Sequence, residues 1–256
     1  MADHVPIKIA CYTCITGNYE NSQTVQFPNE NVSFFLFSDQ NIEVSFPWKL
    51  IRLSEELNFS NQDLQRFVKI QPHLFPELQG YDYLIYVDGN VEIIGNLTTF
   101  ISSIGIDDTT IALFQHPVRN LVSEELKACA MYGHQHFIGL IKHFLFLKKN
   151  DFKDEMGLYE TGVFVWNMRN YNHHFSELWW ETYFNSAKRD QLALPFALQK
   201  SKNLFKNIGC SNFRGNSEFF NLIPHLQNRS FKKRIYRLLN LPFWITSWNP
   251  TINPRN

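Results

Sequence analysis

Short apolar segments alternate along this chain with longer segments of helical period, and this alternation constrains the fold more than any other feature. The short segments are rich in β-branched and aromatic residues, as strands are, and they cover residues 7–15, 32–37, 48–53, 83–88, 111–115 and 163–167. Several are apolar at nearly every position, which is typical of central strands covered on both sides. We therefore predict an α/β fold with a mostly parallel central sheet and helices on both faces.

The segments of helical period lie between these strands or after the last of them, at residues 60–70, 122–148, 173–187 and 189–200. In the first of them, Ser60 and Asp63 have the spacing of a capping box. Pro72 cannot continue a helix. These signals predict a helix that begins just after Ser60 and ends before Pro72.

The composition argues against two classes of function. The chain has 24 Lys and Arg against 24 Asp and Glu among its 256 residues, so no net charge favours binding to nucleic acid. No apolar run approaches the roughly 18 to 20 residues that a membrane span needs. The first residues lack the basic and then apolar pattern of a secretory signal, so we expect a cytoplasmic location.

Two of the four cysteines, Cys11 and Cys14, have the spacing of a metal or redox motif. They lie in a predicted strand, however, where residues three apart point to opposite faces. The two thiols therefore cannot share a metal or a disulfide there. We predict that they are small core residues in a reducing compartment.

The most informative polar residues follow the strand at 83–88. This strand would deliver Asp88 at its carboxyl end, where ligands bind in open α/β sheets. Asp88 and Asn90 would face the same side, and Gly89 lets the backbone approach a ligand closely. Such oxygen ligands suit Mg²⁺ or Mn²⁺. Alternatively, Asp-Gly-Asn is a turn between two strands, and the triplet alone does not separate these interpretations.

Other polar side chains lie at the ends of predicted strands and helices. Asp39 follows the second strand, where it could accept hydrogen bonds from a base or ribose or form an Asx turn. Arg66 and Lys69 share a helix face, and they would either clamp phosphates or form a solvated surface. His116 and Arg119 place an imidazole and a guanidinium in the loop after another strand.

Two later segments add carboxylates. Glu160 lies between Gly157 and Gly162 just before a strand, as expected of a loop that approaches a substrate. Asp190, in Arg189-Asp190-Gln191, opens a helix, where it would be either a helix cap or a catalytic carboxylate.

Taken in order, these motifs resemble a known family. The order is YTCITGNY at 12–19, FSD at 37–39, RFVKIQPH at 66–73, VDGN at 87–90, HPVR at 116–119, GLYET at 157–161 and RDQL at 189–192. The ordered set, spread over about residues 7 to 200, resembles the glycosyltransferase-like family of bacterial and plant proteins formerly catalogued as a domain of unknown function. It is more distantly similar to GT-A-fold sugar transferases of the glycogenin and lipopolysaccharide galactosyltransferase type.

The resemblance implies a GT-A-like catalytic domain over residues 1–227 that uses a UDP-sugar with Mn²⁺ or Mg²⁺. By resemblance, the residues that would bind the donor nucleotide are Thr13, Ile15, Thr16, Tyr19, Asp39, Arg66, Lys69, Asp88 and Gly89. The catalytic residues would be Asp190 and Glu160. Other substrate contacts would come from His116, Arg119, Tyr159, Thr161 and Gln191. The metal ligands would be Asp88, Asn90 and His225, although Asn90 stands where the wider pattern has a second carboxylate.

The activity that the resemblance implies is transfer of a sugar to a saccharide or glycolipid acceptor, in bacterial surface polysaccharide or lipopolysaccharide assembly. Inversion and retention at the anomeric carbon are both compatible with it. The alternative is a nucleotide-sugar-binding or scaffold protein that has this fold without turnover.

Residues 228–256 form a basic amphipathic segment of different composition. Its cations, which alternate with apolar side chains, are Arg229, Lys232, Lys233, Arg234 and Arg237. Two tryptophans follow, at 244 and 248. This pattern predicts peripheral contact of residues 229–248 with an anionic membrane, at the inner face of the cytoplasmic membrane. The alternative is a terminal helix that packs on the domain with its cations in solvent.

Overall fold

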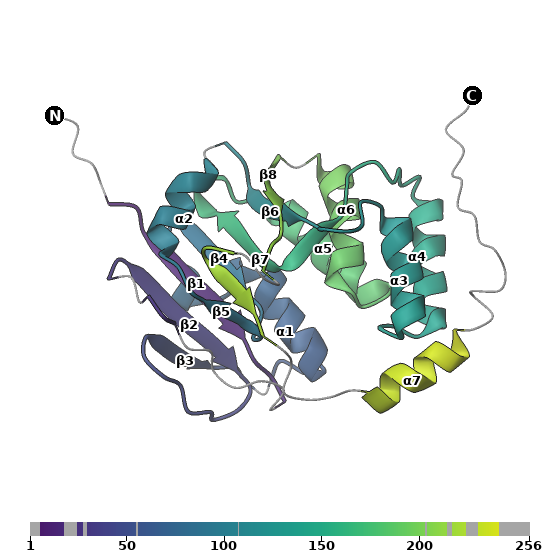
Figure 1. Ribbon diagram of the computed structural model, residues 1–256, viewed down its shortest axis with the longest axis horizontal. Coiled ribbons are helices and arrows are strands. Elements are labelled where there is room, and N and C mark those ends of the chain that lie inside the picture. The colour runs from purple at the N-terminus through teal and green to yellow at the C-terminus, as the bar shows by residue number, and fades with distance from the viewer. Residues whose placement is uncertain are drawn as a thin grey trace.

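The computed structural model describes residues 6–17, 25–27, 30–54, 56–106, 108–202, 204–213, 217–223 and 230–240, with only the backbone at 230–232. At its centre is a seven-stranded sheet with the strand order β3-β2-β1-β4-β7-β6-β8 (Figure 1). The strands are β1 (Ile9–Cys14), β2 (Val32–Ser38), β3 (Trp48–Arg52), β4 (Tyr83–Val87), β6 (Ile111–Gln115), β7 (Tyr159–Asn167) and β8 (Phe205–Cys210). Only β7 runs antiparallel to its neighbours in this sheet, so the predicted mostly parallel sheet is confirmed.

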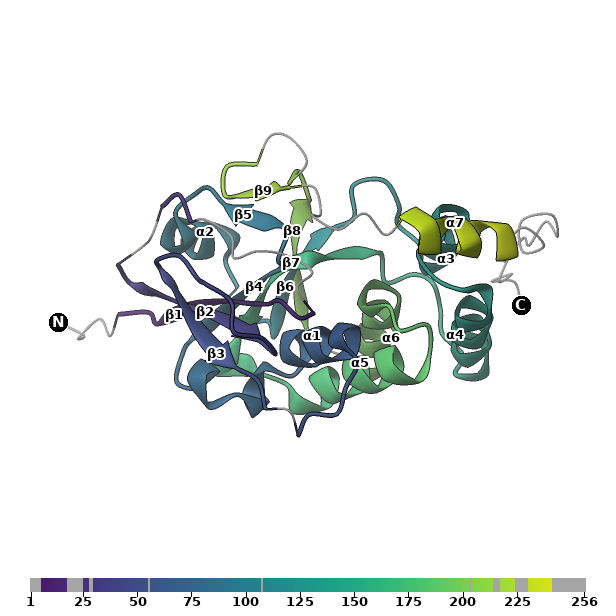
Figure 2. The same ribbon diagram turned by 90° about the horizontal axis from the view of Figure 1, so that it is seen from below.

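Helices cover both faces of the sheet, as predicted. The helices are α1 (Asn61–Ile70), α2 (Leu97–Ile104), α3 (Val122–Tyr132), α4 (Phe137–Lys149), α5 (His173–Asn185), α6 (Asp190–Ser201) and α7 (Ser230–Leu239). Figure 2 shows α1, α5 and α6 on one side of the sheet. On the other side lie α2 and a small antiparallel sheet of β5 (Val91–Ile93) and β9 (Phe220–Leu222). Three short 3-10 helices complete the elements of the described residues, namely η1 (Pro72–Leu74), η2 (Pro76–Leu78) and η3 (Met168–Asn170).

The side chains of β1 alternate between two hydrophobic cores. Tyr12 and Cys14 pack in the core beneath α1, α5 and α6, whereas Cys11 and Ile15 pack in the core beneath α2. The prediction that Cys11 and Cys14 lie on opposite faces is therefore confirmed, and both are free buried thiols. Burial raises the pKa of each thiol well above its ordinary value, which keeps both protonated.

Helix α1 begins and ends where its sequence predicts. The Ser60 hydroxyl accepts a hydrogen bond from the backbone N–H of Asp63 at 3.2 Å, and η1 starts at Pro72. The carboxylate of Asp63 accepts hydrogen bonds from the Ser60 hydroxyl at 2.7 Å and from Lys188 Nζ at 2.7 Å. Burial raises the pKa of Asp63, but these donors and the Tyr183 hydroxyl hold that pKa below its ordinary value.

The prediction of continuous helix over residues 122–148 is wrong, because the chain breaks at Gly133. Gly133 ends α3 with a φ of 64°, a left-handed conformation that favours glycine. The chain then turns, and α4 starts at Phe137. A helix-period pattern runs through this break because the apolar residues of the two helices face a common core, which includes Leu126 and Leu140.

Helix α7 packs on α3 and on the loop before α4. Asn240, buried at the end of α7, donates hydrogen bonds to the carbonyl oxygens of Ala130 at 3.1 Å and of Gln135 at 3.0 Å. The rings of His136 and Tyr236 lie 5.4 Å apart. The side chains of Lys233, Arg234 and Arg237 are exposed. The structure therefore has this helix packed on the domain with Lys233, Arg234 and Arg237 exposed, while residues 241–248 lie outside the described part of the chain.

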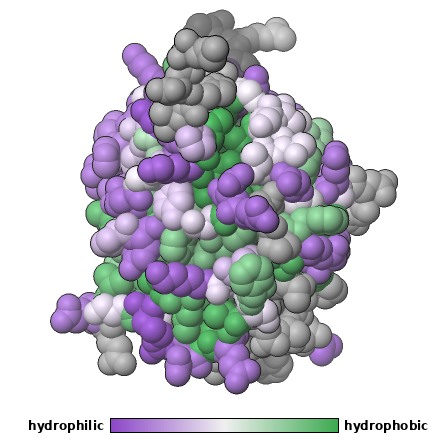
Figure 3. Space-filling model, turned by 90° about the vertical axis from the view of Figure 1, so that its left-hand side faces the viewer, coloured by the Kyte–Doolittle hydropathy of each residue, from purple (hydrophilic) through white to green (hydrophobic). Residues whose placement is uncertain are grey.

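The surface on the left of Figure 1, where β2, β3 and α2 lie, carries strips of apolar side chains among polar ones (Figure 3). The end formed by α3, α4 and α7 faces away from that view. None of the described helices is long and apolar enough to cross a bilayer.

Candidate functional site

Several of the predicted site residues gather at the carboxyl edge of the parallel strands. Because β7 runs the other way, its first residues, Tyr159 and Glu160, lie at this same edge. The loops after β1 and β2 meet there, since the backbone N–H of Gly17 donates to Asp39 Oδ1 at 3.1 Å. The loop after β1 also contacts the start of α1, where the Thr16 hydroxyl donates to the Asn61 carbonyl at 2.7 Å.

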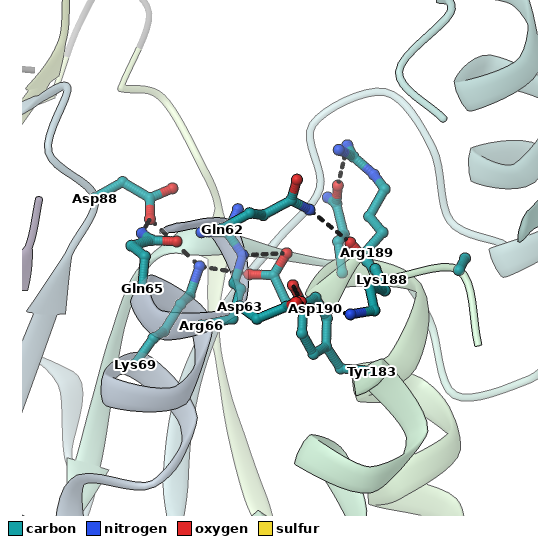
Figure 4. Close-up of polar contacts among 12 residues, drawn as sticks. Gln62, Asp63, Gln65, Arg66, Lys69, Asp88, Tyr183, Lys188, Arg189 and Asp190 are labelled. Carbon is teal, nitrogen blue, oxygen red and sulfur yellow. Dashed lines mark hydrogen bonds and ion pairs between the residues drawn. The ribbon is translucent and has the colours of Figure 1, made fainter. Parts of the chain in front are cut away.

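A buried lysine joins two carboxylates in the middle of this edge (Figure 4). Lys69 Nζ lies 2.5 Å from Asp190 Oδ2 and 3.4 Å from Asp88 Oδ1, and its side chain is fully buried. Arg66 Nε lies 3.1 Å from Asp190 Oδ1. One face of α1 supplies both cations, because residues three apart are neighbours on a helix surface. The interpretation of this face as solvated is therefore wrong for Lys69.

The two cations fix the charge of Asp190. Burial raises the pKa of Asp190, but Arg66 and Lys69 lower it far more, so that it lies well below its ordinary value. Burial lowers the pKa of Arg66, but Asp190 and Asp88 raise it above its ordinary value. Asp190 is the first residue of α6, and its side chain contacts these cations rather than capping the helix. It is an ionised carboxylate that is a poor acceptor of protons.

One carboxylate oxygen of Asp88 is hydrogen-bonded within the protein, and the other faces the site. Oδ1 accepts hydrogen bonds from the Tyr86 hydroxyl at 2.8 Å and from Gln65 Nε2 at 3.3 Å. Oδ2 accepts no hydrogen bond from the described residues, and it lies beside Gly162, where an added Cβ would approach it to 3.4 Å. The side chain of Asp88 is 26% exposed, so this second oxygen can reach a ligand.

The Asp-Gly-Asn triplet is also a turn, as the alternative interpretation has it. The backbone N–H of Val91 donates to the Asp88 carbonyl at 2.9 Å. The turn does not close a hairpin, because β5 pairs with β9 instead of β4. Asn90 is mostly buried, and its Nδ2 donates to the Ile223 carbonyl at 3.2 Å. Asp88 and Asn90 therefore have different surroundings, and only Asp88 joins the ion-pair cluster.

A second ion-pair cluster, centred on the buried Glu125, borders the first. Arg119 Nε lies 2.7 Å from Glu125 Oε2, and Arg189 Nη2 lies 2.7 Å from Glu125 Oε1. Burial raises the pKa of Glu125, but Arg189 and Arg119 hold it below its ordinary value. Sequence reasoning missed Glu125. The available signal was its position on the same helix face as Val122, Leu126 and Cys129, all of which are buried.

His116 lies between the Glu125 cluster and Glu160. Its Nδ1 accepts hydrogen bonds from the backbone N–H groups of Val118 at 3.1 Å and Arg119 at 2.9 Å. These contacts assign the proton of a neutral imidazole to Nε2. Nε2 lies 3.9 Å from Glu160 Oε1, so the imidazole faces that carboxylate.

The remaining predicted residues are placed less centrally. Thr13 is 1% exposed and Ile15 is 3% exposed, so both lie within the core under the site. Tyr159 packs on the ring of Phe205. Gln191 Nε2 donates to the Tyr159 carbonyl at 3.2 Å, which ties α6 to β7. Thr161 is buried in β7, and Gly89 is part of the Asp-Gly-Asn turn.

Two predicted residues, Tyr19 and His225, lie outside the described residues. Among the residues that the structure does describe, no group of three or more His, Cys, Asp or Glu could hold a metal ion by itself.

Comparison with known proteins adds no family to this picture. The sequence matches no protein-family model, and a search of curated proteins gives no significant match.

Proposed function

We propose that this protein is a glycosyltransferase that moves a sugar from a UDP-sugar to a saccharide acceptor with the help of Mn²⁺ or Mg²⁺. One observation carries the proposal: Asp88 stands with Lys69, Arg66 and Asp190 at the carboxyl edge of a mostly parallel sheet. Open α/β sheets bind nucleotides and other ligands at this edge. The motif resemblance supplies the GT-A-type fold and the UDP-sugar as parts of the proposal.

The cations of α1 favour an anionic leaving group. Sugar transfer releases a nucleoside diphosphate. Negative charge therefore develops on its phosphate oxygens as the bond between the sugar and the diphosphate breaks. Arg66 is 22% exposed and can contact these oxygens directly. Lys69 is fully buried, so it acts by holding Asp88 and Asp190 in place.

The residues at Asp88 fit a divalent cation that the donor diphosphate helps to hold. Asp88 Oδ2 is the available oxygen, whereas Asn90 in the same turn is mostly buried and donates its Nδ2 to the Ile223 carbonyl. One carboxylate gives a weak site, so the diphosphate would provide most of the charge. When bound, the cation would neutralise the leaving diphosphate.

The environments of the two predicted catalytic carboxylates assign them different roles. Asp190 is paired with two cations and its pKa is depressed, which makes it a positioning residue for Arg66 and Lys69. The Glu160 side chain is 17% exposed and faces His116 Nε2 at 3.9 Å. Glu160 is therefore the better candidate for a group that accepts the proton of an acceptor hydroxyl.

Calorimetric titration of UDP into the protein, with and without Mn²⁺, tests the donor site. We expect binding that requires Mn²⁺ and that weakens at least about tenfold in Asp88→Ala, because one charged metal ligand is worth more than about 1.4 kcal/mol. Asp82→Ala is the matched control, since Asp82 precedes the same strand at its other end and pairs with Arg169 on the surface. Equal UDP affinity in Asp88→Ala and wild type would refute the proposed donor site.

A scaffold protein that binds nucleotide-sugars without turnover is the alternative. Release of UDP from UDP-sugars in the presence of mixed saccharide acceptors separates the two. Turnover that Asp88→Ala abolishes and Asp82→Ala preserves would support the transferase. UDP binding without turnover would support the scaffold. The proposed setting is bacterial surface polysaccharide or lipopolysaccharide assembly, with a saccharide or glycolipid acceptor at the inner face of the membrane.

A further inference from the structure

The Glu125 cluster has more positive than negative charge. Two guanidinium groups, of Arg119 and Arg189, contact the single carboxylate of Glu125. The neighbouring cluster of Lys69, Arg66, Asp88 and Asp190 has two charges of each sign and is balanced. The Glu125 cluster therefore keeps one positive charge that no carboxylate in the cluster neutralises.

This excess charge is accessible from solvent. The side chain of Glu125 is 1% exposed, whereas those of Arg119 and Arg189 are 27% and 29% exposed. The carboxylate is thus buried, whereas the two arginine side chains that contact it are partly exposed. Burial lowers the pKa of the nearby His134 to about 4, with further lowering by Arg189 and Lys233, so this histidine is neutral and does not add to the charge.

Both guanidinium groups are held in fixed orientations. Arg189 contacts Glu125 Oε1 through both Nε, at 3.0 Å, and Nη2, and Nη2 also donates to Gln191 Oε1 at 3.0 Å. Arg119 Nε donates to Glu125 Oε2 at 2.7 Å. Guanidinium groups held in this way bind carboxylate or phosphate with a small loss of side-chain entropy.

The position of the cluster indicates which substrate it would contact. Arg189 directly precedes Asp190, yet Figure 4 shows the two side chains pointing in different directions, with Asp190 toward α1 and Arg189 away from it. Arg119 is in the loop of His116, which faces Glu160. The cluster therefore borders Glu160 and lies apart from the cations assigned to the donor diphosphate.

We propose that Arg119 and Arg189 form a subsite for the carboxylate or phosphate group of an acidic saccharide acceptor. This inference rests on the proposed function for the identity of the acceptor. The subsite would bind an acidic sugar beside Glu160 and discriminate against a neutral sugar of the same shape.

Titration of three sugars into the full chain, in the presence of UDP and Mn²⁺, tests the subsite. The sugars are glucose 6-phosphate, glucuronate and glucose. We expect both acidic sugars to bind at least about tenfold more tightly than glucose, because charge-assisted hydrogen bonds to arginine are strong. Arg119→Gln should bring the acidic sugars to the affinity of glucose. The control Arg169→Gln, which changes an arginine paired with Asp82 on the surface, should leave the preference unchanged.

The outcomes are distinct even if one variant fails. If Arg119→Gln does not fold, Arg119→Lys keeps the charge beside Glu125 but loses the planar fork, and we expect a smaller preference that survives in part. Equal affinity for glucose and both acidic sugars in the wild type would overturn the subsite. Inorganic phosphate that binds as tightly as glucose 6-phosphate would overturn the saccharide assignment. If UDP binding depends on Asp88 but the protein does not prefer acidic sugars, only this inference is refuted. If the protein prefers acidic sugars but does not bind UDP, only the proposed donor site is refuted.

Discussion

Replacement of Lys69 by methionine tests whether the buried cation holds the site together. Lys69 is fully buried between Asp190, at 2.5 Å, and Asp88, at 3.4 Å. Removing one partner of a buried ion pair costs about 3–5 kcal/mol, because the remaining charge stays buried without compensation. Asp190 retains Arg66 at 3.1 Å, so we expect Lys69→Met to lower the free energy of unfolding by about 3 kcal/mol, the lower end of this range.

Urea denaturation at neutral pH measures this loss. Arg169→Met is the matched control, because Arg169 is 51% exposed and its pair with Asp82 should contribute less than about 1 kcal/mol. A loss below about 1 kcal/mol in Lys69→Met would refute the reasoning.

Two further predictions concern the packing of α7 and the response to pH. Gly133→Ala should lower the melting temperature and speed proteolysis of α7. The added Cβ would lie 2.2 Å from the Lys233 carbonyl oxygen, and the φ of 64° at residue 133 is strained for alanine. The control is Gly80→Ala, since Gly80 also has a positive φ but an added Cβ there would have no atom within 4 Å. Equal effects of the two changes would contradict the packing of α7 on α3. Burial lowers the pKa of His143 to about 4, below its unfolded value near 6.5, so the unfolded chain takes up the proton first. The contribution of neutral His143 to stability should therefore be fully present above about pH 6.5 and be lost as the pH falls toward 4. Urea midpoints measured across this range should decline less steeply in His143→Gln than in the wild type. An unchanged slope would exclude the histidine as the source of the decline.

The sequence predicts the fold where local signals and burial agree. Cys11 and Cys14 lie in an apolar strand, and their opposite faces follow from its period of two. Strand β8 was missed because it is an edge strand, with Lys206 and Asn207 exposed and no apolar run to mark it. Helix α2 and the three-residue strands β5 and β9 are too short for a clear period.

The candidate site is predictable in its members but not in its pairings. Asp88, Lys69 and Asp190 could each be placed at the end of a strand or on a helix face. That Lys69 bridges the two carboxylates depends on the start of α6 lying beside α1, and segments far apart in the sequence give no local signal of this. Glu125 was missed because a glutamate in a helix is ordinarily solvated, and only the tertiary structure places two arginines around it.

The bridge made by Lys69 has a consequence for the order in which the chain becomes native during synthesis. Lys69 leaves the ribosome long before Asp190, and strand β4 leaves it long before β7, its neighbour in the sheet. A buried Lys69 without Asp190 would keep only the longer contact to Asp88, at 3.4 Å, so we expect the nascent amino-terminal strands to stay loosely packed until α6 has emerged. The cation and the carboxylates of the proposed donor site would then reach their places together, and a truncated chain that ends before Asp190 would not assemble this cluster.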